Sequence, residues 1–257
     1  MTDAMLMSHS WNPFYIVLSF VIASVTSYLS LELARDGDAQ DRTRRQVGQG
    51  LLLGYGIWAM HFVGMLAFQV PVGLSFNVPL TVVSGLVSVA FLVAAVMFLN
   101  RGPQTLVRII ASGTIAGTGI VLMHYSGMAA MQVDAVSRYV ALPFLLSVLI
   151  AVSAASVAFY LFSRVMTTRL DGPARLAIQG GAALVMGVAI VGMHYTGMAA
   201  VQYSYRMSPM VGSPLSEGGA DQSTLGMMVG GASVLVFVCT FALILADSVG
   251  RRSALTR

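Results

Sequence analysis

Three stretches of this chain are variants of one pattern. They read GYGIWAMHFVGMLAFQ at residues 54–69, GTGIVLMHYSGMAAMQ at 117–132 and GVAIVGMHYTGMAAVQ at 187–202. With the histidine as position 0, all three share Gly at −7, Ile at −4, Met at −1, Gly at +3, Met at +4, Ala at +6 and Gln at +8, and an aromatic residue always stands at +1. Self-similarity of this kind marks a repeat architecture, so we predict one structural unit used three times.

The composition of the whole chain is that of a membrane protein. Of its 257 residues, 57% are hydrophobic and 9% are charged, whereas a soluble domain has about 25% charged residues. Each apolar run is long enough for the ~20 helical residues that cross a bilayer. The sequence therefore predicts an all-α, polytopic membrane protein of seven transmembrane helices, built as three helix-pair repeats plus one helix. The runs lie at about 13–33, 47–68, 79–99, 106–131, 139–163, 176–201 and 225–247.

Arginine is distributed unevenly between the connecting segments. Twelve arginines lie in or beside segments 34–46, 100–105, 164–175 and 248–257, and the alternate segments hold only Arg138 and Arg206. Cytoplasmic loops carry such an excess, so the N-terminus is predicted outside and the C-terminus inside. The chain then divides into an external tail at 1–12, a membrane domain at 13–249 and a cytoplasmic tail at 250–257. Because the motif helices share a direction, the histidines are predicted at one depth, toward the outer side.

The motif places potential metal ligands on one side of each helix. At 3.6 residues per turn, positions −7, 0 and +4 fall within about 40° of one another. An ionisable side chain inside a membrane is costly and is a candidate for function, while imidazole binds copper and thioether sulfur prefers Cu(I). The candidate copper ligands are therefore His61, Met65, His124, Met128, His194 and Met198. The secondary candidates are the −1 methionines and two +1 aromatics, namely Met60, Met123, Met193, Tyr125 and Tyr195.

Several other interpretations of the motif remain open. Each histidine can simply donate a hydrogen bond across a helix interface while the methionines fill gaps. His and Met are also axial ligands of heme iron, so a heme-binding redox protein is an alternative. Copper handling, by transport or insertion, is suggested by external methionines at 1, 5, 7, 207 and 210. No Cys, Asp or Glu lies at the depth of the histidines, which argues against structural zinc and against calcium or magnesium.

The sequence shows no sign of an enzyme or of a nucleic-acid partner. No Ser-His-Asp set, phosphate loop or pair of carboxylates is visible. The net charge of +4 comes from arginines in short loops, without a basic face or a nucleic-acid motif. We therefore predict a protein without catalytic residues and without nucleic-acid binding.

One copy of the motif carries a resemblance to a known family. Met193-His194-Tyr195-Thr196 matches the name motif of the MHYT domain family of bacterial membrane proteins letter for letter. The copies that begin at Met123 and at Met60 differ from it at one and at two positions. With the triplicate spacing and the predicted topology, the chain resembles this family from about Trp11 to Val249.

The resemblance implies a stand-alone sensor domain in the bacterial inner membrane, with its histidine motifs toward the periplasm. Copper bound by the motif His and Met is expected to report a diatomic gas (O2, CO or NO) or the redox state. Many relatives carry cytoplasmic domains that make or hydrolyse cyclic di-GMP, or histidine kinases. A chain without such a domain is expected to lie in the lipid bilayer and to signal only through a separate signalling protein or by self-association.

Overall fold

Seven long helices make up most of the described chain. The structure is a computed structural model that describes residues 6–34, 42–167, 172–205 and 219–255. Each of the seven helices found there is long and apolar enough to cross a membrane, so the predicted seven-helix membrane fold is confirmed. They are α1 (Pro13–Leu33), α2 (Arg42–Leu66), α3 (Val78–Leu99), α4 (Leu106–Ala130), α5 (Ala141–Thr167), α6 (Gly172–Met198) and α7 (Gln222–Leu255).

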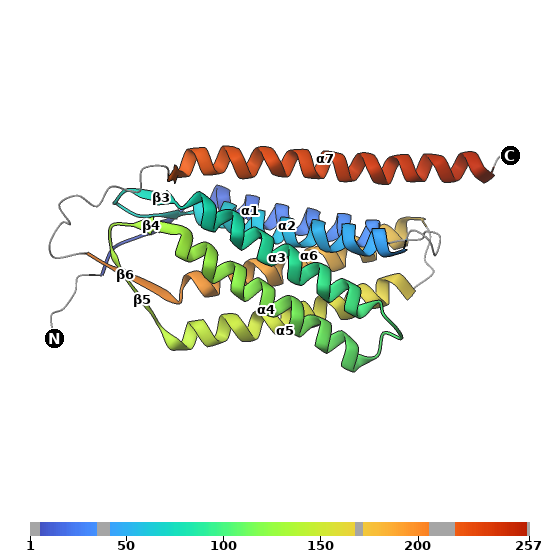
Figure 1. Ribbon diagram of the computed structural model, residues 1–257, viewed down its shortest axis with the longest axis horizontal. Helices are drawn as coiled ribbons and strands as arrows, with labels where there is room; N and C mark the ends of the chain where they lie inside the picture. Colours follow the sequence, from blue (N-terminus) through green and yellow to red (C-terminus); the bar gives the residue numbers. More distant parts are fainter. Residues whose placement is uncertain (1–5, 35–41, 168–171, 206–218, 256–257) are drawn as a thin grey trace.

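The first six helices form a closed ring. Each contacts the next in chain order, and α6 returns to α1. The motif helices α2, α4 and α6 therefore alternate with the companion helices α1, α3 and α5, and they also approach one another across the centre of the ring. Helix α7 lies outside the ring, along α2 and α1, and is the red helix at the top of Figure 1. This pseudo-threefold arrangement brings the three repeated motifs to a common axis.

Asparagine side chains define where two companion helices begin. The side chain of Asn12 accepts a hydrogen bond from the backbone N–H of Phe14 at 3.0 Å, and a proline opens the helix directly after it. Asn77 does the same for Leu80 at 2.9 Å, again with a proline in the first turn. Asparagine is a preferred N-cap and proline is favoured in the first turn, so these ends are determined locally.

The glycine at −7 lets each motif helix touch its following companion helix. A Cβ atom on Gly54 would lie 2.5 Å from the Cα of Val89 in α3, and one on Gly117 would lie 2.7 Å from the Cα of Val152 in α5. At the equivalent position, a Cβ atom on Gly187 would meet the side-chain hydroxyl of Ser24 in α1. The predicted stripe of Gly, His and Met thus meets a companion helix at −7, whereas its histidine lies at the central axis. These contacts also define equivalent positions in the companion helices.

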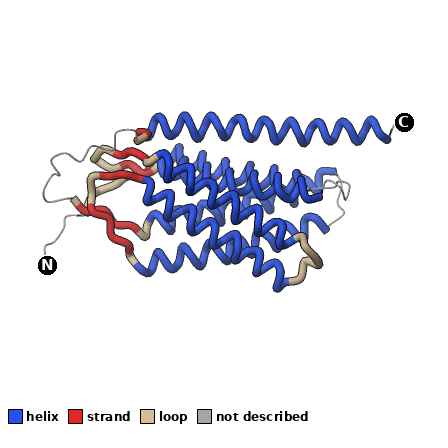
Figure 2. Tube along the Cα trace, in the orientation of Figure 1, coloured by secondary structure: helices blue, strands red, loops and turns tan. Residues whose placement is uncertain are grey.

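Short strands cap one end of the bundle (red in Figure 2). The strand after each motif helix pairs antiparallel with the strand before the same repeat's companion helix, and the Gln at +8 lies in each of these three pairs. Two of these strands lie in the described parts of the connection between α6 and α7. The strands are β1 (Ser10–Trp11), β2 (Phe68–Gln69), β3 (Leu74–Phe76), β4 (Met131–Val133), β5 (Val136–Tyr139), β6 (Val201–Ser204) and β7 (Ala220–Asp221).

The segment before α1 is part of this cap. The backbone N–H of Met7 donates to the carbonyl of Tyr203 at 2.8 Å, and the Met7 side chain is buried. The other external methionines, at 1, 5, 207 and 210, lie outside the described residues. We call this end the capped end and the opposite one, where Arg42 and Arg101 lie, the arginine-rich end.

Candidate metal centre

The three motif histidines meet in one cluster on the bundle axis. His61 comes from α2, His124 from α4 and His194 from α6, and each side chain is at most 1% exposed. One nitrogen of each ring lies within 4.8 Å of the corresponding nitrogens of the other two. The three histidines therefore lie at the same depth, as predicted, and they form one cluster rather than three separate sites.

The Nδ1 atoms face one another at the centre of this cluster. His61 Nδ1 lies 3.0 Å from His194 Nδ1 and 3.1 Å from His124 Nδ1. The ring centroids are 4.9, 4.9 and 5.3 Å apart, and the rings meet edge to face. Three nitrogens bound to one metal ion at about 2.0–2.1 Å lie about 3.3–3.6 Å apart. Outward shifts of a few tenths of an ångström would therefore convert the cluster into a set of metal ligands.

The Nε2 atoms point outward at the glycines of position +3, in a cyclic order. His61 Nε2 faces Gly127, His124 Nε2 faces Gly197 and His194 Nε2 faces Gly64. A Cβ on Gly64 would lie 2.5 Å from His194 Nε2, so a larger residue would displace the ring. Each repeat thus holds the histidine of another repeat against its own backbone.

The protonation of the three rings determines which species the centre of the cluster can hold. A neutral imidazole carries one N–H and one lone pair. The Nε2 atoms are buried without a hydrogen bond of ordinary geometry to the described protein groups, although the backbones of Gly197 and Gly64 interact with the rings of His124 and His194. If Nε2 carries the proton, three lone pairs converge at Nδ1. Such a set needs either a shared proton or a cation, and a metal-bound histidine commonly directs its other N–H at a backbone carbonyl.

The candidate methionines are all buried around the histidines. Met65, Met128 and Met198 at +4 belong to a hydrophobic cluster toward the capped end, together with Met60. Met123 and Met193 at −1 lie in the cluster on the other side of the histidines. The structure thus surrounds the imidazole centre with thioethers on both sides.

The aromatic residues at +1 point to neighbouring helices. Tyr125 Oη lies 2.6 Å from Ser147 Oγ in α5, and Tyr195 Oη lies 3.3 Å from Ser19 Oγ in α1. Phe62 of the first copy is fully buried in the hydrophobic cluster toward the capped end. Both phenol groups therefore make helix-to-helix hydrogen bonds away from the Nδ1 centre.

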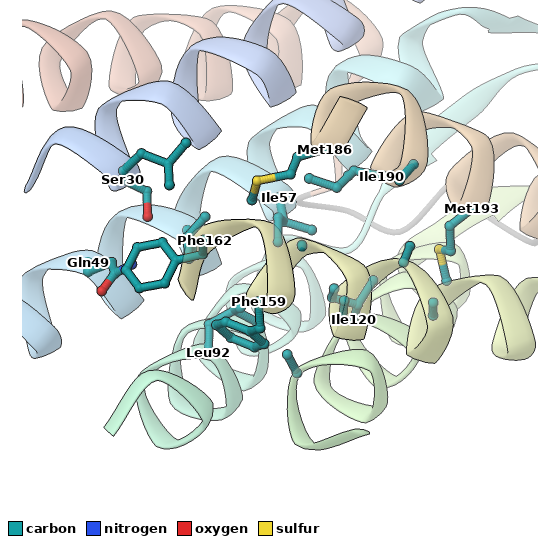
Figure 3. A pocket seen from close by; sticks show the side chains of 18 residues that line it. Ser30, Gln49, Ile57, Leu92, Ile120, Phe159, Phe162, Met186, Ile190 and Met193 are labelled. Carbon is teal, nitrogen blue, oxygen red and sulfur yellow. The ribbon is translucent and has the colours of Figure 1, made fainter. Parts of the chain in front are cut away.

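Below the histidines, toward the arginine-rich end, the axis holds an apolar cavity (Figure 3). The isoleucines at −4 line it, and so does Met193, which directly precedes His194. Polar atoms reach the cavity mainly at its far end, from Gln49 and Ser30. The histidine cluster is therefore enclosed by a strand cap above and an apolar space below.

Sequence reasoning missed the role of the +3 glycine. The glycine is present in all three copies, but helical spacing groups the −7 and +4 positions, and not +3, with the histidine. Only the packing of different repeats shows that Gly64, Gly127 and Gly197 contact the histidine rings. An invariant glycine beside an invariant histidine was the available signal, because glycine in a membrane helix indicates close approach.

Comparison with known proteins gives consistent matches along the chain. A family model named MHYT, described as a repeat at the N terminus of bacterial signalling proteins, matches residues 54–112 and 117–172. The bifunctional diguanylate cyclase/cyclic di-GMP phosphodiesterase MucR of Pseudomonas aeruginosa is 38% identical over 239 residues, which are 91% of this chain and 33% of that protein. The cyclic di-GMP phosphodiesterase NbdA of the same organism is 35% identical over 90% of this chain and 29% of its own length.

A relative from another bacterium also matches most of this chain. The signalling protein YkoW of Bacillus subtilis is 32% identical over 78% of this chain and 25% of its own length. This chain thus spans a third or less of these relatives, and no solved structure matches it. The repeated motif, the six-helix ring and these matches agree, and the chain belongs to the MHYT family of bacterial membrane signalling domains.

Proposed function

We propose that this membrane signalling domain is a sensor whose three motif histidines bind one copper ion. The observation that carries the proposal is the convergence of three buried Nδ1 atoms, two of them 3.0 and 3.1 Å from the third. A single ion at their centre would be held by His61, His124 and His194, one from each repeat. It would bring a redox-active Lewis acid to the axis of the ring.

The chemistry of the surrounding groups favours copper. No group of Asp, Glu or Cys within the described residues joins the histidine cluster, and an all-imidazole set suits copper, zinc, iron or nickel. Copper(II) binds nitrogen ligands more tightly than the other divalent ions of its series. The buried thioethers on both sides would additionally favour Cu(I). Heme fits less well, because ring centroids 4.9–5.3 Å apart leave no space for a porphyrin between them.

The signal proposed is a diatomic gas, O2, CO or NO, or the redox state of the surroundings. Three protein ligands leave a coordination position open, which is the arrangement of reactive metal sites. Small uncharged molecules dissolve in the bilayer and in an apolar interior. A change of ligand or of oxidation state would alter the preferred separation of the three imidazoles, and hence of the three motif helices.

Helix α7 is the proposed route from the centre to a partner. It packs on α2, where Tyr55 Oη lies 3.2 Å from Ser233 Oγ and Gln222 donates to the carbonyl of Phe68 at 3.3 Å. A displacement of α2 at His61 would therefore also displace α7. In this chain the recipient would be a separate signalling protein or a second copy.

Metal analysis tests the proposal directly. The purified protein is titrated with Cu(I) and Cu(II) against a chelator of known affinity, and bound metal is counted per chain. One copper per chain is expected, and none in a variant with all three histidines replaced by Ala. Binding that is equal in the wild type and this variant would refute the proposal.

Copper handling is the second candidate, and one observation favours it. The thioethers of Met186 and Met193 line the axial cavity below the histidines, so soft ligands continue toward the arginine-rich end. Uptake of copper into proteoliposomes that depends on these methionines would support transport. An absorption spectrum separates both ideas from a heme protein, which would show a Soret band.

A further inference from the structure

The axial cavity is long and narrow. Its lining runs from Gln49, twelve residues before His61, to Met193, one residue before His194. This span corresponds to about 16 Å of helix rise. The centres of water-sized molecules can occupy about 50 Å³ of it. Spread evenly over the length, these centres fill a column about 2 Å across, and the ~1.4 Å radius of a water molecule on each side widens the bore to about 5 Å. That is about the width of one extended hydrocarbon chain.

A break in the pseudo-threefold symmetry creates this space. The contacts of the −7 glycines make Val89 of α3 equivalent to Val152 of α5 and Ser24 of α1. Two residues after this position, α3 has Phe91, which packs on Gly119, whereas α5 has Ala154. Three residues after it, α3 has Leu92 and α5 has Ala155. The alanines of α5 therefore form one wall of the cavity, at 151, 154, 155 and 158.

The cavity becomes polar at its far end. Ser30 of α1 and Gln49 of α2 line it there. Gln49 is 2% exposed and its Nε2 has no hydrogen-bond partner among the described protein groups. A buried donor of this kind is destabilising unless an acceptor meets it.

We propose that the cavity binds a single acyl chain. The chain lies against the alanine wall of α5 and points toward Met193, and its carbonyl oxygen accepts a hydrogen bond from Gln49 Nε2. A lipid of the leaflet at the arginine-rich end or a free fatty acid supplies the same chemistry. The occupant sits directly below His194 and is distinct from any ligand of the metal.

Water and metal ions fit this space poorly. A buried water needs two to four polar partners, and the lining between the Gln49 end and the histidines consists of Leu, Ile, Ala, Phe and Met. A hydrocarbon chain has no polar atoms to satisfy there, and burial of its methylenes away from water is favourable. The one polar group of an ester or acid falls where the unpartnered Gln49 Nε2 lies.

Native mass spectrometry of the full chain in detergent tests this proposal, with methyl dodecanoate as the added probe. The wild type is expected to retain one acyl-bearing molecule, whose mass separates a phospholipid from a free fatty acid, and to bind one probe after delipidation. Ala155→Leu puts into α5 the residue that α3 carries and should reduce retention at least tenfold. Val157→Leu, on the exposed face of the same helix, is the matched control and should retain the ligand.

A second variant separates the polar contact from the apolar one. Gln49→Leu should bind methyl dodecanoate no better than dodecane, whereas the wild type should prefer the ester. Equal retention by the wild type, Ala155→Leu and Val157→Leu would mean adventitious surface lipid only and would overturn the proposal, as would the absence of binding to the wild type. Copper binding is measured separately, so this result does not decide the proposed sensor function.

Discussion

Replacement of Gly64 by alanine tests whether the motif glycine positions the histidine centre. The added Cβ would lie 2.5 Å from Nε2 and 2.8 Å from Cδ2 of His194. Ordinary contact between such atoms begins near 3.4 Å, so the ring must move by about 0.9 Å. The ring is 1% exposed, and overpacking of a filled core costs about 1–3 kcal/mol.

The direction of this movement decides its effect on metal binding. His61 lies one turn before Gly64 on the same helix, α2. A methyl group on residue 64 that pushes His194 away from α2 therefore also moves it away from His61. The distance between the Nδ1 atoms of these two histidines, which is 3.0 Å in the structure, would increase. A shift of about 0.9 Å carries that separation beyond the 3.3–3.6 Å of nitrogens that share one metal ion. Changes in the groups that orient metal ligands typically cost 10–100-fold in affinity, and we expect a loss of about that size.

Competition with a copper chelator, together with thermal unfolding, measures both consequences. Gly192→Ala is the matched control, because a Cβ there meets no atom within 4 Å and alanine favours a helix by about 1 kcal/mol over glycine. The control should bind copper as the wild type does. A Gly64→Ala protein that folds and binds copper with unchanged affinity would refute the proposed contact between glycine and histidine.

Four other predictions follow from the same geometry. Replacing any one motif histidine by alanine should abolish stoichiometric copper binding, whereas retention of two thirds of the metal would indicate three independent sites. Replacing the +4 methionines by leucine should weaken Cu(I) binding and leave Zn²⁺ binding unchanged; equal Cu(I) affinities would assign these thioethers to packing alone. Tyr125→Phe should lower the unfolding free energy by about 1 kcal/mol, because its bond to Ser147 is lost, and should leave copper affinity unchanged; weaker copper binding would place the phenol at the centre. Ser233→Ala should cost about 0.6 kcal/mol, as expected for a hydrogen bond between membrane helices, and a melting temperature equal to that of the wild type would show that its contact with Tyr55 does not hold α7.

Much of the fold could be predicted because a bilayer imposes simple requirements. A spanning segment must satisfy its own backbone and must be apolar over its length, so seven apolar runs predict seven helices. The short strands of the cap were not predictable, since two to four residues are too few to show a period of two. Their pairing depends on which helix ends lie side by side, and this follows from the closed ring.

The sequence by itself determined the three copies of the motif, the seven spans and the common depth of the histidines, because each of these follows from position along the chain. Only the tertiary structure decided that the rings meet with Nδ1 inward and that Gly64, Gly127 and Gly197 each receive a histidine of another repeat. It alone showed that alanines in α5 open a cavity below His194. The physical reason is that helical periodicity specifies the direction of a side chain relative to its own helix, whereas the neighbour it meets depends on how the helices close into a ring.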